Sequence, residues 1–189
     1  MNFGYLFILF IIILIIYYYY KSLVFPIVLE KSSLDNNQYW VRNEIDKKEA
    51  ANLISLLVNK TMLLIKQLKN DYPNNIITKR LENKFNPKNI MESYHKGDNN
   101  TYTVNKGEMI YICLRNKDTN KLIDINILFY VLIHEITHLT TTNLKHDEYF
   151  WNNYKFLLKH AIKYKLYKYE NYNKYPVKYC DIIINSSPN

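Results

Sequence analysis

This chain of 189 residues is poor in cysteine, has no internal repeat, and carries no charged side chain before Lys21. Its two cysteines, Cys113 and Cys180, provide no disulfide framework of the kind that holds small secreted domains together, and they agree with a reducing compartment. Proline is also absent from residues 3–20, an uncharged stretch of mainly aliphatic and aromatic side chains. The remaining signals for function are therefore the start of the chain and one histidine-containing motif.

Residues 3–20 are predicted to form a transmembrane helix. These residues, at about 1.5 Å of rise each, give about 27 Å, which is enough to span the core of a bilayer. Tyr17–Tyr20 would then lie at the interface, where aromatic rings collect. A cleaved signal peptide would need a positive start, a shorter core and small residues before the cut, and none is present. A buried core helix is disfavoured because no face is polar. We expect a retained anchor over residues 1–21 that binds the lipid bilayer.

The rest of the chain is predicted to be one domain behind a linker. Residues 22–46 carry serine, asparagine and mixed charge and are interpreted as a tether with little structure. Residues 47–189 are long enough to bury a core of their own. Within them, apolar periodicity predicts an amphipathic helix over residues 47–69 and a shorter one over 75–85. A further helix is expected over residues 147–167, followed by a tyrosine-rich tail with short extended pieces.

The segment before Leu139 places two histidines four residues apart in an apolar helical run, with a glutamate directly after the first. Positions i and i+4 share one face of an α-helix, so His134 and His138 can bind one metal ion. Glu135 stays close enough to reach a water molecule on that metal. This is the HExxH arrangement of zinc peptidases, in which the glutamate is the general base. The alternative is that the histidines are ordinary residues of a partly exposed helix.

A catalytic zinc site usually takes a third protein ligand. We favour His146, which follows His138 by eight residues, because that distance allows the chain to leave the helix and fold back. Glu148 and Asp147 are rivals, although both also suit the first turn of a following helix, where the dipole favours negative charge. A solvated loop histidine is the other interpretation of His146. The two remaining histidines are interpreted as surface or packing residues: His95 and His160.

The motif and its spacing resemble the zincin metallopeptidases of the WLM and SprT-like group: His134-Glu135-x-x-His138-x7-His146-Asp147-x-x-Phe150-Trp151. The likeness is strongest to small, membrane-anchored members predicted in large DNA viruses of eukaryotes. It runs from about Ala50 to the C-terminus and includes residues 102–107, 110–115, 156–158 and 176–180. The resemblance implies a minimal zincin-like α+β domain, in which a small sheet with an antiparallel edge packs on the HExxH helix and flanking helices.

The resemblance also implies a zinc-dependent endopeptidase that acts on proteins or peptides. One zinc ion would be held by His134, His138 and His146, and Glu135 would take a proton from a zinc-bound water and deliver it to the leaving amine. An oxyanion stabiliser is needed as well, and the sequence does not choose among three candidates: Tyr149, Tyr154 and Tyr179. The alternative function is that of a catalytically silent, membrane-anchored protein that keeps the fold for a structural or interaction role.

Two short β-rich runs just before the motif are predicted to form a hairpin, residues 102–104 and 109–114. Gly107 between them would supply a left-handed position. In zincins an edge strand beside the active-site helix binds extended peptide by strand addition, and the resemblance suggests the same use here. A plain core strand is the alternative.

The formal net charge of +8 raises the question of a nucleic-acid partner. The lysines are scattered through a chain rich in asparagine, isoleucine and tyrosine, a composition typical of an AT-rich genome. The basic C-terminal third suits anionic lipid as well as DNA. Nucleic acid is thus a partner without specific support in the sequence. Positive residues after the predicted span, such as Lys21 and Lys31, favour a catalytic domain on the cytoplasmic side or in the virion interior.

Overall fold

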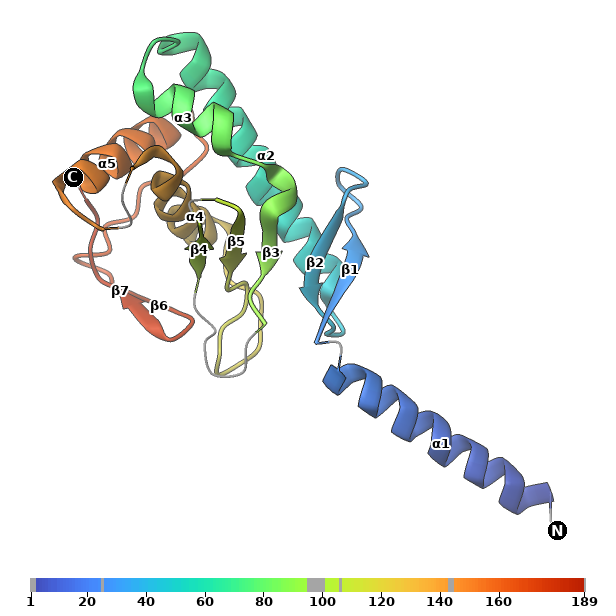
Figure 1. Cartoon of the computed structure of the whole chain (residues 1–189). Coiled ribbons are helices and arrows are strands. Elements are labelled where there is room, and N and C mark those ends of the chain that lie inside the picture. The colour runs from blue at the N-terminus through green and yellow to red at the C-terminus, as the bar shows by residue number, and fades with distance from the viewer. Residues whose placement is uncertain (1–2, 25, 95–100, 106, 143–144, 189) are drawn as a thin grey trace.

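The computed structural model describes residues 3–24, 26–94, 101–105, 107–142 and 145–188. Figure 1 shows a long N-terminal helix that projects from a body of helices packed around a small sheet. The helices are α1 (Phe3–Val24), α2 (Lys47–Asp71), α3 (Ile76–Lys84), α4 (Ile125–Thr140) and α5 (Glu148–Lys163), with a 3-10 turn at Pro87–Asn89. The strands are β1 (Ile27–Lys31), β2 (Gln38–Arg42), β3 (Ile90–Glu92), β4 (Tyr102–Val104), β5 (Met109–Ile112), β6 (Val177–Tyr179) and β7 (Ile182–Ile184).

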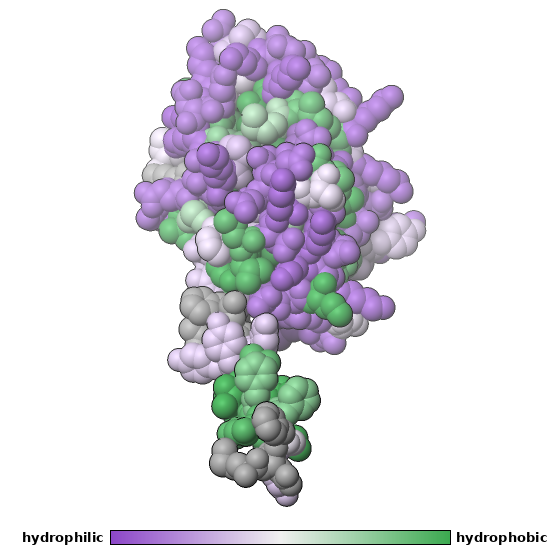
Figure 2. Space-filling model, turned by 90° about the vertical axis from the view of Figure 1, so that its right-hand side faces the viewer, coloured by the Kyte–Doolittle hydropathy of each residue, from purple (hydrophilic) through white to green (hydrophobic). Residues whose placement is uncertain are grey.

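The helix expected over residues 3–20 is present as α1, and it lies outside the packed body (Figure 1). Its large side chains from Tyr5 to Tyr20 are exposed, and in Figure 2 they form a mostly apolar stalk below a largely hydrophilic surface. Among the residues that the structure describes, no helix is both long enough and apolar enough to cross a membrane, so the predicted transmembrane span is not supported.

The prediction of a tether with little structure over residues 22–46 is wrong, because this segment contains a hairpin that packs on the body. Strands β1 and β2 pair in antiparallel register. Every second residue of β2 is buried, with Tyr39 at 4% and Val41 at 0% exposure. The backbone N–H of Arg42 donates to Oε2 of Glu92 at 2.7 Å, which joins the hairpin to β3. The alternation within β2 is the signal that the mixed composition of the segment concealed.

Helix α4 lies in the core and is flanked by α2, α3 and α5 (Figure 1). The helices predicted over residues 47–69 and 75–85 are confirmed as α2 and α3, while α5 ends at Lys163, four residues before the expected end. The amide side chain of Asn75 caps α3 by accepting from the N–H of Ile77 at 2.8 Å. The four helices surround a continuous apolar cluster, whose completely buried members include Ile54, Leu57, Leu64, Leu68, Leu81, Phe129, Phe150 and Leu157.

The hairpin predicted before the motif is confirmed as β4 and β5. These strands pair antiparallel, β3 joins β5 in parallel on its other side, and β4 is left at the edge of the three-stranded sheet. Gly107 in the turn has φ +109°, and a Cβ at this position would lie 2.9 Å from Cγ of Leu139 on α4. Glycine is therefore required both by the backbone conformation and by the close approach of the turn to the helix.

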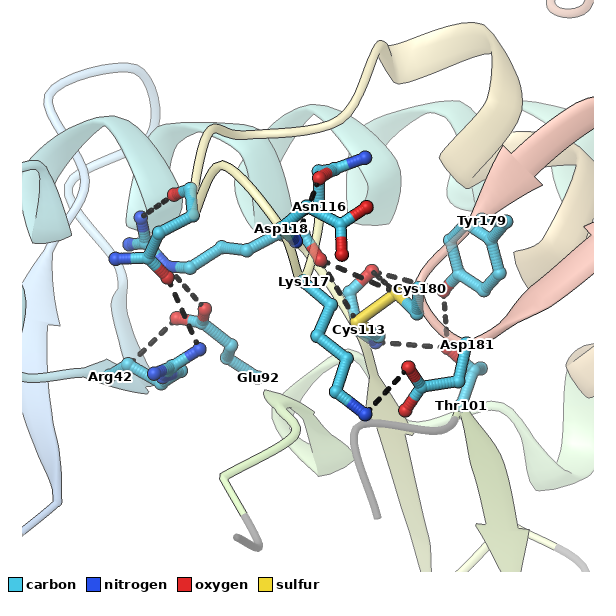
Figure 3. The surroundings of a disulfide bond; sticks show 12 residues. Arg42, Glu92, Thr101, Cys113, Asn116, Lys117, Asp118, Tyr179, Cys180 and Asp181 are labelled. Carbon is cyan, nitrogen blue, oxygen red and sulfur yellow. Dashed lines mark hydrogen bonds and ion pairs between the residues drawn. A yellow bond between two sulfur atoms is a disulfide. The ribbon is translucent and has the colours of Figure 1, made fainter. Parts of the chain in front are cut away.

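The two cysteines form a disulfide, contrary to the expectation drawn from their number. Cys113, just after β5, is bonded to Cys180 in the turn between β6 and β7, 67 residues away (Figure 3). The hydroxyl of Tyr179 donates to the carbonyl of Cys113 at 3.0 Å, and an ion pair of 2.8 Å between Lys117 and Asp181 lies alongside. A single bond can join distant segments without a wider framework, so the cysteine count did not exclude it. The bond also removes the argument for a reducing compartment.

Candidate active site

Helix α4 presents the HExxH residues opposite a face that is completely buried. The helix begins at a side-chain cap, in which Asp124 accepts from the N–H of Asn126 at 2.8 Å. Five apolar side chains on the buried face have no exposed surface: Leu128, Phe129, Leu132, Ile133 and Ile136. This packing fixes the rotation of the helix about its axis. As a result His134 and His138 face the same side, one turn apart.

The three predicted histidine ligands come together in the structure. Nε2 of His146 lies 3.0 Å from Nε2 of His134 and 3.2 Å from Nε2 of His138. His146 comes from the loop between α4 and α5, as expected for a chain that leaves one helix and folds back. The cluster of potential metal ligands found in the described residues consists of these histidines and does not include the two rivals. Asp147 instead caps α5, its carboxylate accepting from the N–H of Phe150 at 2.9 Å.

Phe150 is the packing surface on which the three imidazoles rest. It is completely buried, and its ring centroid lies 4.8 Å from that of His134, 4.6 Å from His138 and 4.5 Å from His146. Trp151 flanks the same cluster, with centroid distances of 6.0 Å to His134 and 5.9 Å to His146. These ring contacts restrict the rotation of the imidazoles.

Hydrogen bonds also fix the end of α4 from which the His146 loop departs. Nη1 of Arg80 on α3 donates to the carbonyl of Thr140 at 2.8 Å and to the hydroxyl of Tyr149 at 3.0 Å. Nδ2 of Asn153 on α5 donates to Oγ1 of Thr140 at 2.9 Å. The last turn of α4 is thus joined to both neighbouring helices. The position of His146 therefore depends on these contacts as well as on the number of residues between it and His138.

The electrostatics of the cluster fit a zinc ion. Burial, followed by the neighbouring imidazoles, lowers the pKa of His134 to about 3 and that of His138 to about 4, so both rings are neutral near pH 7. Neutral imidazole is the form that binds metal. Nδ1 of His138 is buried without a hydrogen-bond partner. Ligand nitrogens about 2.0–2.1 Å from a tetrahedral zinc lie about 3.3 Å apart, close to the spacing of the Nε2 atoms.

Glu135 is buried beside the histidines, with 6% of its surface exposed. Burial raises the pKa of its carboxyl to about 7, and the hydroxyl of Thr103 partly offsets this by donating to Oε2 at 2.7 Å. A carboxyl with a pKa near neutrality is suited to accept and return a proton. Thr103 lies on β4 and was missed by sequence reasoning. The available signal was that successive side chains of a strand point to opposite faces, which puts Thr103 on the other face from Tyr102 and Val104.

The structure separates the three candidate tyrosines. Tyr149 is exposed, and its hydroxyl accepts from Arg80 away from the cavity next to Glu135. Tyr154 and Tyr179 are buried and line that cavity, and burial raises the pKa of both phenols, which keeps them protonated. Tyr154 donates to the carbonyl of Tyr130 over a long 3.4 Å, while Tyr179 is held by Thr101 as well as by the Cys113 carbonyl.

A cavity of about 400 Å³ opens beside His134 and Glu135. One wall comes from α4 and α5, and the opposite wall comes from the β6–β7 hairpin and the residues after it. The lining side chains are mainly apolar and aromatic: Tyr130, Val131, Trp151, Tyr154, Tyr179, Cys180, Ile182, Ile183 and Ile184. Sequence reasoning placed the C-terminal tail near the domain but did not identify it as part of the site. No local pattern in the tail shows which surface it covers.

Of the two histidines interpreted as surface or packing residues, the structure places one. His160 is buried on α5, where its Nδ1 bonds to the carbonyl of Phe156 at 2.7 Å and its ring packs 4.8 Å from that of Tyr72. It lies outside the cluster of potential metal ligands. His95 falls outside the described residues.

Known proteins share both the sequence and the fold of this chain. The sequence profile of the WLM domain family matches residues 48–177. An uncharacterized protein of Acanthamoeba polyphaga mimivirus is 30% identical over 164 residues, which cover 82% of this chain and 81% of that protein. An uncharacterized protein of Invertebrate iridescent virus 6 is 35% identical over 69 residues, which cover 35% of this chain and 38% of that protein. The crystal structure of Wss1 from Saccharomyces cerevisiae superposes with a TM-score of 0.52 at 23% identity, covering 67% of this chain and 88% of that one.

Proposed function

Because the chain belongs to the WLM domain family, a family of zinc metallopeptidases, we propose that it binds one zinc ion and hydrolyses peptide bonds. His134, His138 and His146 would be the zinc ligands, and Glu135 would be the general base. The observation that carries this proposal is the convergence of three imidazoles beside a buried carboxyl, with Nε2 of His146 3.0 Å from that of His134 and 3.2 Å from that of His138.

The protein's own residues would divide the reaction between them. A bound zinc ion would supply Lewis acidity, which acidifies a water molecule and polarises the carbonyl to be attacked. Glu135 would take the proton of the attacking water and pass it to the leaving amine. Thr103 would keep the carboxylate in one orientation through its hydrogen bond. Tyr154 or Tyr179, both protonated and both beside the cavity, would donate to the developing oxyanion.

The edge strand β4 offers a place for the substrate backbone. Its outer edge has no neighbouring strand in the described part of the sheet, where the order is β3-β5-β4. Thr103 on this strand contacts Glu135 directly. An extended peptide that adds to β4 would therefore run past the general base, and backbone hydrogen bonds would hold it without requiring a particular side chain.

The test uses the full chain, metal analysis and proteolysis of casein. We expect one zinc ion per chain, cleavage that a chelator abolishes, and loss of cleavage in Glu135→Gln with zinc retained. Glu49→Gln is the matched control, because Glu49 is exposed on the first turn of α2, and it should keep full activity. Zinc binding without turnover by the unaltered chain would instead support the alternative, a catalytically silent zincin fold. Full activity in Glu135→Gln would exclude the general-base role.

We further propose that α1 attaches the domain to a lipid bilayer. The support is its continuous exposed apolar surface from Tyr5 to Tyr20, far larger than isolated apolar residues on a protein surface. Flotation of the full chain with phospholipid vesicles tests this. Replacing Ile11 and Leu14 by lysine should abolish flotation without affecting casein cleavage, since both belong to α1, which lies outside the body (Figure 1). Flotation that persists in this variant would contradict attachment through α1.

A further inference from the structure

The cavity beside Glu135 has the chemistry of a side-chain pocket. We propose that it receives a large apolar side chain, aromatic or long aliphatic, from the residue next to the peptide bond that is cleaved. This inference rests on the proposed function and adds a substrate class to it. The lining of the cavity, the exposed apolar side chains at its rim and the contacts that hold its outer wall all favour such an occupant.

The lining is mainly apolar, although Thr101, Asn185 and Ser186 add uncharged polar groups to it. Val131 from α4 lies on one side, and the segment Ile182–Ile184 lies on the other. Among the described residues that line the cavity, Glu135 is the one acid and there is no lysine or arginine. A charged substrate side chain would lose its water without gaining an opposite charge other than the general base itself. A volume of about 400 Å³ is at the lower end of the range for ligand pockets, about 300–1,000 Å³, and suits one large side chain.

Three apolar side chains that line the cavity are partly exposed to solvent. Ile182 is 53% exposed, Ile183 is 65% exposed, and Trp151 opposite them is 38% exposed. All three line the same cavity. An apolar side chain that enters between them would remove this surface from water, which is favourable in proportion to the area buried. The rim therefore favours the same occupant as the interior.

The outer wall is held in place before any substrate binds. The disulfide joins Cys180 to Cys113 at the end of β5, and the hydroxyl of Tyr179 donates to the Cys113 carbonyl (Figure 3). On the other side, the hydroxyl of Tyr130 on α4 donates to the carbonyl of Ser186 at 2.7 Å. The wall is thus fastened to both the sheet and the HExxH helix. A preformed pocket selects side chains by fit and loses little entropy on binding.

The position of the cavity assigns the occupant to a residue next to the cleaved bond. His134 and Glu135 themselves form part of the lining, so a side chain in the cavity lies beside the metal ligands and the base. A peptide that pairs with β4 brings its backbone to the same place, because Thr103 of β4 contacts Glu135. The backbone and the side chain would therefore be held on two adjoining surfaces.

The test is a peptide series in which one residue is varied as Phe, Leu, Ala, Lys or Glu on either side of a single cleavable bond. With the zinc-loaded full chain we expect kcat/KM for the Phe and Leu peptides to exceed that for the Lys and Glu peptides by about tenfold or more on one side of the bond. Val131→Phe, which narrows the cavity beside Glu135, should reverse the order of the Phe and Ala peptides. Val177→Phe is the matched control, since Val177 lies on β6 outside the cavity, and it should keep the original order.

A binding measurement reads the same preference without turnover. In zinc-loaded Glu135→Gln that also carries Trp40→Phe, Trp151 is the only tryptophan, and its fluorescence reports occupation of the cavity mouth. The Phe peptide should bind more tightly than the Lys peptide. If Val131→Phe does not fold, Ile183→Asp on the exposed rim should lower the preference instead. Equal binding and equal cleavage of the Phe and Lys peptides would overturn the pocket and leave the peptidase intact, whereas selective binding without cleavage would overturn only the peptidase.

Discussion

The hydrogen bond from Thr103 to Glu135 leads to a quantitative prediction about pH dependence. The Thr103 hydroxyl donates to Oε2 of Glu135 at 2.7 Å, which stabilises the carboxylate and lowers its pKa against the stronger effect of burial. Thr103→Val keeps the shape of the side chain and removes the donor. A hydrogen bond to a charged group contributes about 1.5–3 kcal/mol. Since 1.36 kcal/mol corresponds to one pKa unit, the substitution should raise the pKa of Glu135 by about one to two units.

The sign of the effect on activity follows from the role of the carboxylate. Glu135 accepts a proton only when ionised, so a higher pKa moves the acidic limb of the kcat/KM profile to higher pH. The assay is the pH profile of casein or peptide cleavage by the zinc-loaded full chain. Thr103→Ser retains the hydroxyl and should restore the original limb. Thr61→Val makes the same change on α2, where the hydroxyl bonds to the Leu57 carbonyl, and should leave the limb in place. A Thr103→Val profile that superposes on that of the unaltered chain would refute the reasoning.

Three further predictions concern the disulfide and the histidines. Replacing Cys113 and Cys180 by serine should lower the free energy of unfolding by about 2–4 kcal/mol, because the bond closes a long loop; urea titration measures this, and an unchanged midpoint would contradict it. In the metal-free protein, burial and then the neighbouring His146 lower the pKa of His138 to about 4. As the pH falls, His138 is therefore protonated in the unfolded chain before it is protonated in the folded one. The contribution of neutral His138 to stability is complete above about pH 6.5 and is lost as the pH falls toward about 4. His138→Gln should weaken that dependence in urea titrations across this range, and an equally steep decline would be inconsistent with it. His146→Ala should weaken zinc binding by orders of magnitude in a competition with a chromogenic chelator, and retention of full affinity would exclude this ligand.

The parts of the site that could be predicted are those encoded within one or two turns of helix. The spacing of His134 and His138 decides that they share a face, and the apolar residues of the same helix, from Leu128 to Ile136, decide which face is buried. Gly107 marked the turn of the hairpin because few other residues adopt its backbone conformation. The third ligand was less certain from sequence, since His146 reaches the others only through the packing of Phe150 and the contacts at the end of α4.

The parts that could not be predicted depend on contacts between distant segments. The hydrogen bond from Thr103 to Glu135 spans 32 residues, and the disulfide spans 67. The β1–β2 hairpin is held by a side chain of β3, because the carboxylate of Glu92 accepts a hydrogen bond from the backbone N–H of Arg42, 50 residues away. A periodic pattern in one segment shows that a face will be buried but not which other segment buries it. The wall that residues 182–186 contribute to the cavity likewise depends on contacts with distant segments, so it could not be predicted.

The chain order of the C-terminal wall has a consequence for synthesis. The three histidines proposed as ligands and Glu135 precede residue 150, whereas Cys180 and the isoleucines that complete the cavity follow residue 176. A nascent chain whose residues up to 163 have left the ribosome already contains the sequence of α4, α5 and the segment between them, and so every proposed ligand. It lacks the surface that would select a substrate until the β6–β7 hairpin emerges and is oxidised onto Cys113. On this proposal, the residues that would bind metal and the surface that would select a peptide are therefore completed at separate stages of synthesis.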